Sequence, residues 1–129
     1  MNETIIIEAP RAPLAKNALV KVTKNGFAYQ RYRELWQQEL TACATPQQRR
    51  ILRARAELKE KARLKITIYP KRLWPDRMNI FQALVPVVDA CVNVVYLADD
   101  DDRHLALEVA QEKRKGRPLT VLEFSVDRQ

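Results

Sequence analysis

Four consecutive aspartates, Asp99 to Asp102, are the residues of this chain whose type and spacing best suit chemistry. The window from Met78 to Asp102 contains five Asp and no Lys or Arg, although the whole chain carries 23 basic and 16 acidic residues. Adjacent carboxylates repel one another, so they must point into solvent or be neutralised by a cation. Oxygen ligands of this kind suit Mg²⁺, which indicates a metal site, and a solvated acidic loop is the alternative.

Two further carboxylates precede the acidic run. Asp76 lies between a predicted strand and a predicted helix, where it suits both an active-site carboxylate and a helix N-cap, and the two roles do not exclude each other. Asp89 lies late in an otherwise apolar helix and either faces the acidic run or caps a neighbouring loop. His104 directly follows the run, and a lone His is more often a surface or structural residue than a catalyst.

The charge of the rest of the chain favours a polyanionic partner. The formal net charge is +7, which suits a protein that binds nucleic acid, although a solvated basic surface explains the same composition. An acidic segment within such a basic chain is typical of enzymes that hold a divalent metal ion against a phosphodiester. The candidates for contacts to a DNA backbone are Lys71, Arg72, Arg77, Lys113, Arg114, Lys115 and Arg117.

The predicted strands are short and rich in β-branched residues. They run from Thr4 to Glu8, from Leu19 to Thr23 before a hairpin turn at Asn25-Gly26, and from Leu64 to Tyr69. Alternation then predicts a β-hairpin from Leu105 to Val109 and from Leu119 to Val126, around a basic turn, although residues 105–113 also allow a helix.

Three predicted helices complete the domain. Apolar residues at intervals of three and four predict the first helix from Ala28 to Cys43. A capping box at Thr45–Gln48 begins the second, which runs to about Arg63. The third runs from Arg77 to about Val92, with a kink or break where Pro86 removes a backbone donor. Residues 1–129 therefore predict a single α+β domain.

Several classes of protein are excluded by what the sequence lacks. The longest apolar stretch, Ile80 to Ala98, contains Asp, Asn, Gln and Pro and is no transmembrane span, and no signal peptide is visible at the start. Cys43 and Cys91 fit no zinc spacing, so we expect reduced core thiols in a cytoplasmic protein. With only two Gly, the chain has no glycine-rich loop for nucleotide phosphates.

The order of these motifs resembles that of the RusA family of Holliday-junction resolvases, small homodimeric endonucleases often found in prophages. The matching segments are Pro75–Asn79, Val85–Ala90 and Leu97–His104. Two earlier segments, Pro13–Asn17 and Phe27–Arg33, are similar to the family's opening strand, loop and first helix. The resemblance therefore covers most of the chain.

The resemblance implies a Mg²⁺-dependent endonuclease that resolves four-way DNA junctions in recombination and repair. It also implies a homodimer whose domain has a mixed β-sheet packed with two to three helices. The metal ligands and catalytic carboxylates would be Asp76, Asp99 and Asp100, with Asp101-Asp102 as the alternative alignment to the family's Asp pair. Asn79 and Asp89 would support them, and Lys16 would join the DNA-binding residues.

Two departures from the family pattern define the main alternative. Met78 stands where the family has its second Asp, and Val85 stands where the family has a Lys on the helix. A protein that lacks both side chains would be a catalytically weakened or inactive junction-binding protein of the same fold. A third interpretation is a protein-interaction module whose acidic loop docks a basic partner.

Overall fold

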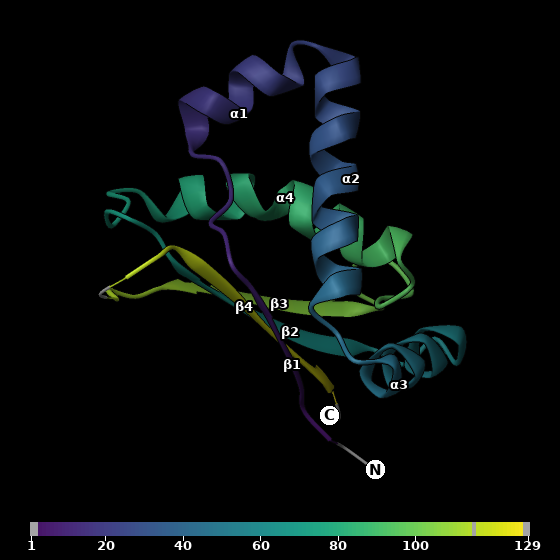
Figure 1. Ribbon diagram of the computed structural model, residues 1–129. Helices are drawn as coiled ribbons and strands as arrows, with labels where there is room; N and C mark the ends of the chain where they lie inside the picture. Colours follow the sequence, from purple (N-terminus) through teal and green to yellow (C-terminus); the bar gives the residue numbers. More distant parts are fainter. Residues whose placement is uncertain (1–2, 115, 128–129) are drawn as a thin grey trace.

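A mixed four-stranded β-sheet, in the order β1-β4-β2-β3, forms the centre of the structure (Figure 1). The computed structural model describes residues 3–114 and 116–127, apart from the side chains of Lys16, Asn17 and Arg77. The strands are β1 (Ile5–Ala9), β2 (Ala62–Tyr69), β3 (Leu105–Gln111) and β4 (Leu119–Val126). The helices are α1 (Lys16–Thr23), α2 (Gly26–Ala42), α3 (Pro46–Glu57) and α4 (Arg77–Asn93). The predicted α+β class with a mixed sheet is confirmed.

The predicted hairpin between the last two strands is wrong, because β2 lies between them. β2 pairs in parallel with β3 and antiparallel with β4, so that Ile66 is opposite Val109 on one side and Leu122 on the other. α4 connects the two parallel strands, as a parallel pair requires. The connection from β3 to β4 crosses the end of β2, where the Glu112 amide still donates to the Ile68 carbonyl. The alternation of apolar and polar residues predicted both strands, but it did not predict which strands they pair with.

The predicted strand from Leu19 to Thr23, with its turn at Asn25-Gly26, is also wrong. This segment belongs to α1, and Asn25 caps α2 by accepting hydrogen bonds from the amides of Phe27 (3.1 Å) and Ala28 (3.3 Å). Asn favours both turns and helix N-caps, so the dipeptide alone does not separate the two. The additional helix raises the number of described helices to four, against the two to three expected.

The other helices begin where the sequence predicts and differ mainly at their ends. The Thr45–Gln48 capping box is present at the start of α3. The helix ends at Glu57 rather than near Arg63, because Lys59 adopts a positive φ of 55° that stops it. α4 runs unbroken through Pro86, which is buried, so packing outweighs the loss of one backbone hydrogen bond.

The hydrophobic core lies between one face of the sheet and the helices, and Figure 1 shows α2 and α4 over that face. Its largest fully buried side chains include Trp36 of α2, Leu84 of α4 and Phe124 of β4. Cys91 is buried in this core and Cys43 is partly buried, and both thiols are free. None of the described helices has the length and apolar character of a membrane span.

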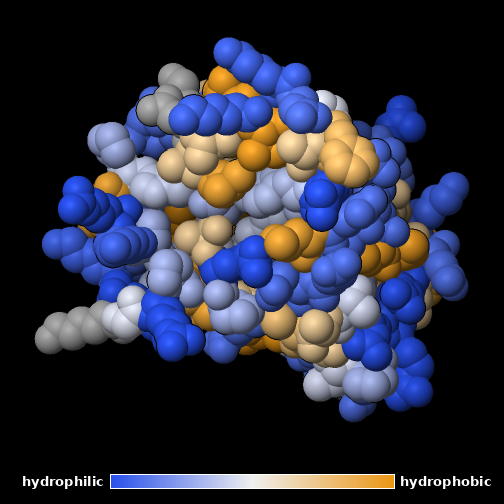
Figure 2. Space-filling view, turned by 45° about the horizontal axis from the view of Figure 1, so that its top comes forward, coloured by the Kyte–Doolittle hydropathy of each residue, from blue (hydrophilic) through white to orange (hydrophobic). Residues whose placement is uncertain are grey.

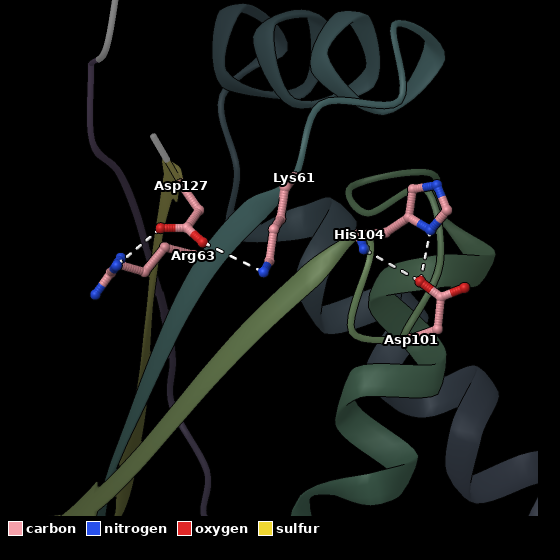
Figure 3. Close-up of polar contacts among 5 residues, drawn as sticks. All are labelled: Lys61, Arg63, Asp101, His104 and Asp127. Atoms are coloured by element: carbon pink, nitrogen blue, oxygen red, sulfur yellow. Dashed lines mark hydrogen bonds and ion pairs between the residues drawn. The ribbon is translucent and has the colours of Figure 1, made fainter. Parts of the chain in front are cut away.

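Asp127, directly after β4, forms ion pairs with Lys61 and Arg63 at the start of β2. Asp127 lies 2.8 Å from the Arg63 guanidinium and 3.6 Å from the Lys61 amine, and its side chain is 6% exposed (Figure 3). Its amide also donates to the Lys61 carbonyl at 2.8 Å. The hydrogen bond from Arg63, together with the charges of Arg63 and Lys61, lowers the pKa of Asp127 below its ordinary value of 3.8. The ionised carboxylate therefore stabilises the fold.

We expect Asp127→Asn to destabilise the protein at about pH 7 and to lose this effect in acid. A carboxylate whose pKa is depressed in the folded state stabilises above its unfolded pKa, and the contribution disappears as the pH falls through the folded pKa. Urea unfolding at about pH 7 and about pH 3 measures both differences. Glu108→Gln is the control, because Glu108 pairs with Lys65 at 3.7 Å on an exposed face and should change stability little. An equal destabilisation by Asp127→Asn at both pH values would contradict the prediction.

Candidate functional site

A groove between α4 and the edge strand β3 is lined by three carboxylates. It is lined by Asp89 from α4 and by Asp100 and Asp102 from the loop that follows. Apolar side chains of α4 and of the edge strand β3, among them Val85 and Leu105, form the rest of its wall. The groove has a volume of about 440 Å³. It is therefore large enough for a hydrated cation and part of a ligand.

Asp89 is partly buried at the wall of this groove. Partial burial raises its pKa, the nearby Arg33 guanidinium acts in the opposite direction, and the charge of Asp100 raises the pKa further. A carboxylate that is both desolvated and next to a second carboxylate favours a proton or a cation at the site. The sequence left open whether Asp89 faces the acidic run, and the structure shows that it does.

The acidic run itself divides into two sets of alternating residues. Asp100 and Asp102 line the groove, whereas Asp99 and Asp101 lie with His104 in a second cluster, where one ligand atom from each falls within 4.8 Å of the others. Asp101 Oδ1 accepts a hydrogen bond from the His104 amide at 3.1 Å and lies 2.6 Å from His104 Nδ1 (Figure 3). The hydrogen bond from His104 lowers the pKa of Asp101. The structure thus groups neither of the adjacent Asp pairs that the sequence suggested.

Asp76 lies at the opposite end of α4. Its carboxylate accepts a hydrogen bond from the Met78 amide at 2.9 Å and caps the helix, so the cap role is confirmed. Asn79 lies in the first turn beside it. The 17 residues of α4 rise 1.5 Å each, so the helix is about 25 Å long, with Asp76 at its N-terminus and the acidic loop after its C-terminus (Figure 1). Within one chain the structure does not bring Asp76 and Asn79 together with Asp99 and Asp100.

The basic candidates gather at the Asp76 end of the molecule. β2 and β3 are parallel, so the loops that follow them leave the same edge of the sheet. The exposed residues of these loops include Lys71, Arg72, Lys113, Arg114 and Arg117. The side chains of Lys16 and Arg77, and all of Lys115, lie outside the described residues. These basic loops and the acidic loop therefore lie at opposite ends of α4. The acidic loop also has basic neighbours, because Arg103 follows it and Arg53 donates to the Val94 carbonyl.

Exposed apolar side chains are distributed rather than gathered. On the face drawn in Figure 2, hydrophobic groups form small patches that are separated by hydrophilic side chains. Met78 and Val85 are 62% and 51% exposed on α4. Neither is needed for the core, so both positions can accept polar side chains.

One residue near the groove was missed by the sequence analysis. Arg33 of α2 acts electrostatically on Asp89, although the two residues are distant in sequence and belong to different helices. α2 carries several charged residues, and no sequence signal distinguishes Arg33 from them. Only the packing of α2 against α4 identifies it.

No protein-family model matches this sequence, and a search of curated proteins finds no significant relative.

Proposed function

We propose that this protein is a metal-dependent endonuclease that cleaves four-way DNA junctions. The observation that carries the proposal is a single groove that is lined by Asp89, Asp100 and Asp102, in a protein of net charge +7. The resemblance to RusA-type resolvases supplies the expected substrate.

The donors of the groove fit Mg²⁺ better than those of the neighbouring cluster. Asp89, Asp100 and Asp102 offer carboxylate oxygens only, the ligands that Mg²⁺ prefers. Asp99 and Asp101 are grouped with the His104 nitrogen, which suits transition metals. When bound, Mg²⁺ would neutralise phosphate charge and activate water. The three groove carboxylates would hold the ion and orient that water.

The basic loops at the other end would position the DNA. Lys71, Arg72, Lys113, Arg114 and Arg117 are exposed, and such side chains would bind phosphates without reading sequence. Such contacts release counterions, so the affinity for a junction should fall steeply with salt. A protein-interaction module that docks through its acidic loop would bind DNA weakly, and its affinity would depend little on salt.

We also propose a homodimer as the active form. A four-way junction is cut in two places, and a two-fold dimer presents two equivalent sites. Light scattering should give twice the chain mass of 15.0 kDa.

The decisive experiment is cleavage of a synthetic four-way junction by the purified protein. We expect nicks when Mg²⁺ is present and none in EDTA, with little cleavage of a linear duplex of the same length. Tight, salt-sensitive junction binding without cleavage in Mg²⁺ or Mn²⁺ would overturn the enzyme proposal. It would instead support the catalytically inactive DNA-binding protein, which the exposed apolar side chains of Met78 and Val85 favour.

A further inference from the structure

We propose that α1 and the first turns of α2 form a second DNA-binding surface, on which the ring of Phe27 stacks on an exposed base of the DNA. Lys21, Lys24 and Arg31 bind the phosphates beside that base. The inference deepens the proposed function and rests on it only in taking DNA as the partner. None of these residues lines the groove or belongs to the basic loops after β2 and β3.

The segment that builds this surface is basic throughout. From Ala9 to Arg33 the sequence contains six Lys or Arg and no Asp or Glu, although the chain has 16 acidic residues in all. Lys21, Lys24 and Arg31 are exposed, and within the described residues none of the three takes part in an ion pair. Their charges are therefore free to attract a polyanion, and the phosphates of a nucleic acid are such a partner.

An exposed aromatic ring lies within this basic segment. Phe27 is 70% exposed in the first turn of α2, and the guanidinium of Arg31 lies over its ring, 5.5 Å from the ring centroid. Gly26 beside it faces open space, with no group from another part of the described chain within 4 Å of the position that a Cβ would take. Bases stack on such rings whatever the sequence of the nucleic acid. Phe27 can therefore receive a base while neighbouring cations hold its phosphates.

The fold does not account for Phe27. Figure 1 shows α1 and the N-terminal end of α2 beyond α4, on the side of that helix away from the sheet. Phe27 lies outside the hydrophobic core and is not among the side chains packed against it. Single exposed apolar residues are common on protein surfaces, and Phe27 differs from them in the cation on its ring and the basic segment around it. The combination indicates a contact with an external partner.

The stacking contact would favour branched DNA over a continuous duplex. Neighbouring base pairs cover the faces of each base in a duplex, and exposing one of those faces costs stacking energy. At the centre of an open four-way junction the stacks of base pairs end, so base faces are accessible there. Phosphate contacts alone carry no information about the bases. Phe27 would therefore supply a preference for junctions that the basic loops cannot provide.

The first test measures affinity for a labelled four-way junction and for a linear duplex of the same length, both in EDTA so that no cleavage is needed. We expect Phe27→Ala and Phe27→Leu to weaken junction binding by about 10-fold and duplex binding little. Phe27→Tyr keeps the ring and should stay within a few-fold of wild type. Leu58→Ala is the matched control, because Leu58 is 73% exposed at the end of α3. A purely hydrophobic contact would not separate Leu from Tyr.

The salt dependence of binding separates stacking from phosphate contacts. Replacing Lys21 and Lys24 together by Gln should weaken binding to both DNAs. It should also lower the slope of log affinity against log salt by about 2, because each lost phosphate contact removes about 0.9. Phe27→Ala should leave this slope unchanged. Arg50→Gln is the control for charge, since Arg50 is exposed on α3 and should alter neither affinity nor slope appreciably.

The outcomes distinguish this inference from the proposed function. Equal junction affinities for Phe27→Ala and Leu58→Ala would overturn the inference and leave the endonuclease proposal intact. The expected binding effects without any cleavage in Mg²⁺ would support the inference and overturn the enzyme proposal. If the wild-type protein binds neither DNA, both are overturned, and binding to phosphatidylserine vesicles instead would assign the surface to a membrane. If the thermal midpoint shows that Phe27→Ala does not fold, the comparison of Phe27→Leu with Phe27→Tyr decides, and equal affinities would overturn the inference.

Discussion

Replacing Asp100 by Asn should reduce Mg²⁺-dependent cleavage of a four-way junction by at least about 100-fold. Asp100 lines the same groove as Asp89, and its charge raises the pKa of Asp89, so the proposed metal site uses both carboxylates. An amide keeps the shape of the side chain but removes the charge that would hold the metal. Single-turnover rates over a Mg²⁺ titration would show a weaker apparent metal affinity and a lower rate at saturation.

Asp101→Asn is the matched control for this prediction. It removes the same charge from the adjacent residue, but that carboxylate contacts His104 and belongs to the second cluster. We expect a rate within a few-fold of wild type. The reverse result, a large loss for Asp101→Asn and little for Asp100→Asn, would place the metal between Asp99, Asp101 and His104. It would contradict the assignment of the groove as the metal site.

The parts of the fold that could be predicted from the sequence are those with a strong local signal. The apolar spacing of α2, the capping box of α3 and the alternation in β2 each determine a local structure with little help from the rest of the chain. Strand pairing is different, because the choice between β2 and β4 as the partner of β3 depends on contacts between distant segments. The strand prediction for residues Leu19 to Thr23 was wrong for a related reason. The β-branched residues of this segment have no strand to pair with, and the segment is helical in α1.

The candidate site was predicted in its components but not in its geometry. The sequence identified the acidic run and Asp89 as candidates but left open whether Asp89 faces that run, and the structure places Asp89 in one groove with Asp100 and Asp102. The predicted helix that became α4 lies between Asp76 and the acidic run. Its predicted length alone indicated that the two are at opposite ends of one helix. Arg33 needed the structure, because its relation to Asp89 comes from the packing of two helices.

The position of Asp76 and the acidic loop at opposite ends of α4 leads to a prediction about the proposed homodimer. In a two-fold dimer whose α4 helices pair antiparallel, the Asp76 end of each copy would lie against the acidic loop of the other. In that dimer, Lys71 and Arg72 beside Asp76 of one copy would face the carboxylates of the other. Each active site would then contain Asp76 of one chain and Asp100 of the other. In such a dimer, motifs that lie at opposite ends of α4 within one chain could still meet in one active site.

Mixing two inactive variants tests this arrangement directly. Asp76→Asn should be inactive although it keeps the helix cap, since Asn caps as well as Asp, and Asp100→Asn should be inactive for the reason given above. If each site is shared between chains, a mixed dimer has one site with both changes and one with neither. After subunit exchange, an equal mixture should therefore recover about a quarter of the wild-type sites.

The alternatives predict different results for the same mixture. If both residues act within one chain, or if the chains act separately, every site keeps one defect and no activity returns. If Asp76 serves only as the cap of α4, the Asp76→Asn variant cleaves junctions at the wild-type rate and the mixture adds nothing. Recovery of activity from two inactive preparations is expected only when the active site is built from both copies, because only then does any dimer contain an intact pair of Asp76 and Asp100.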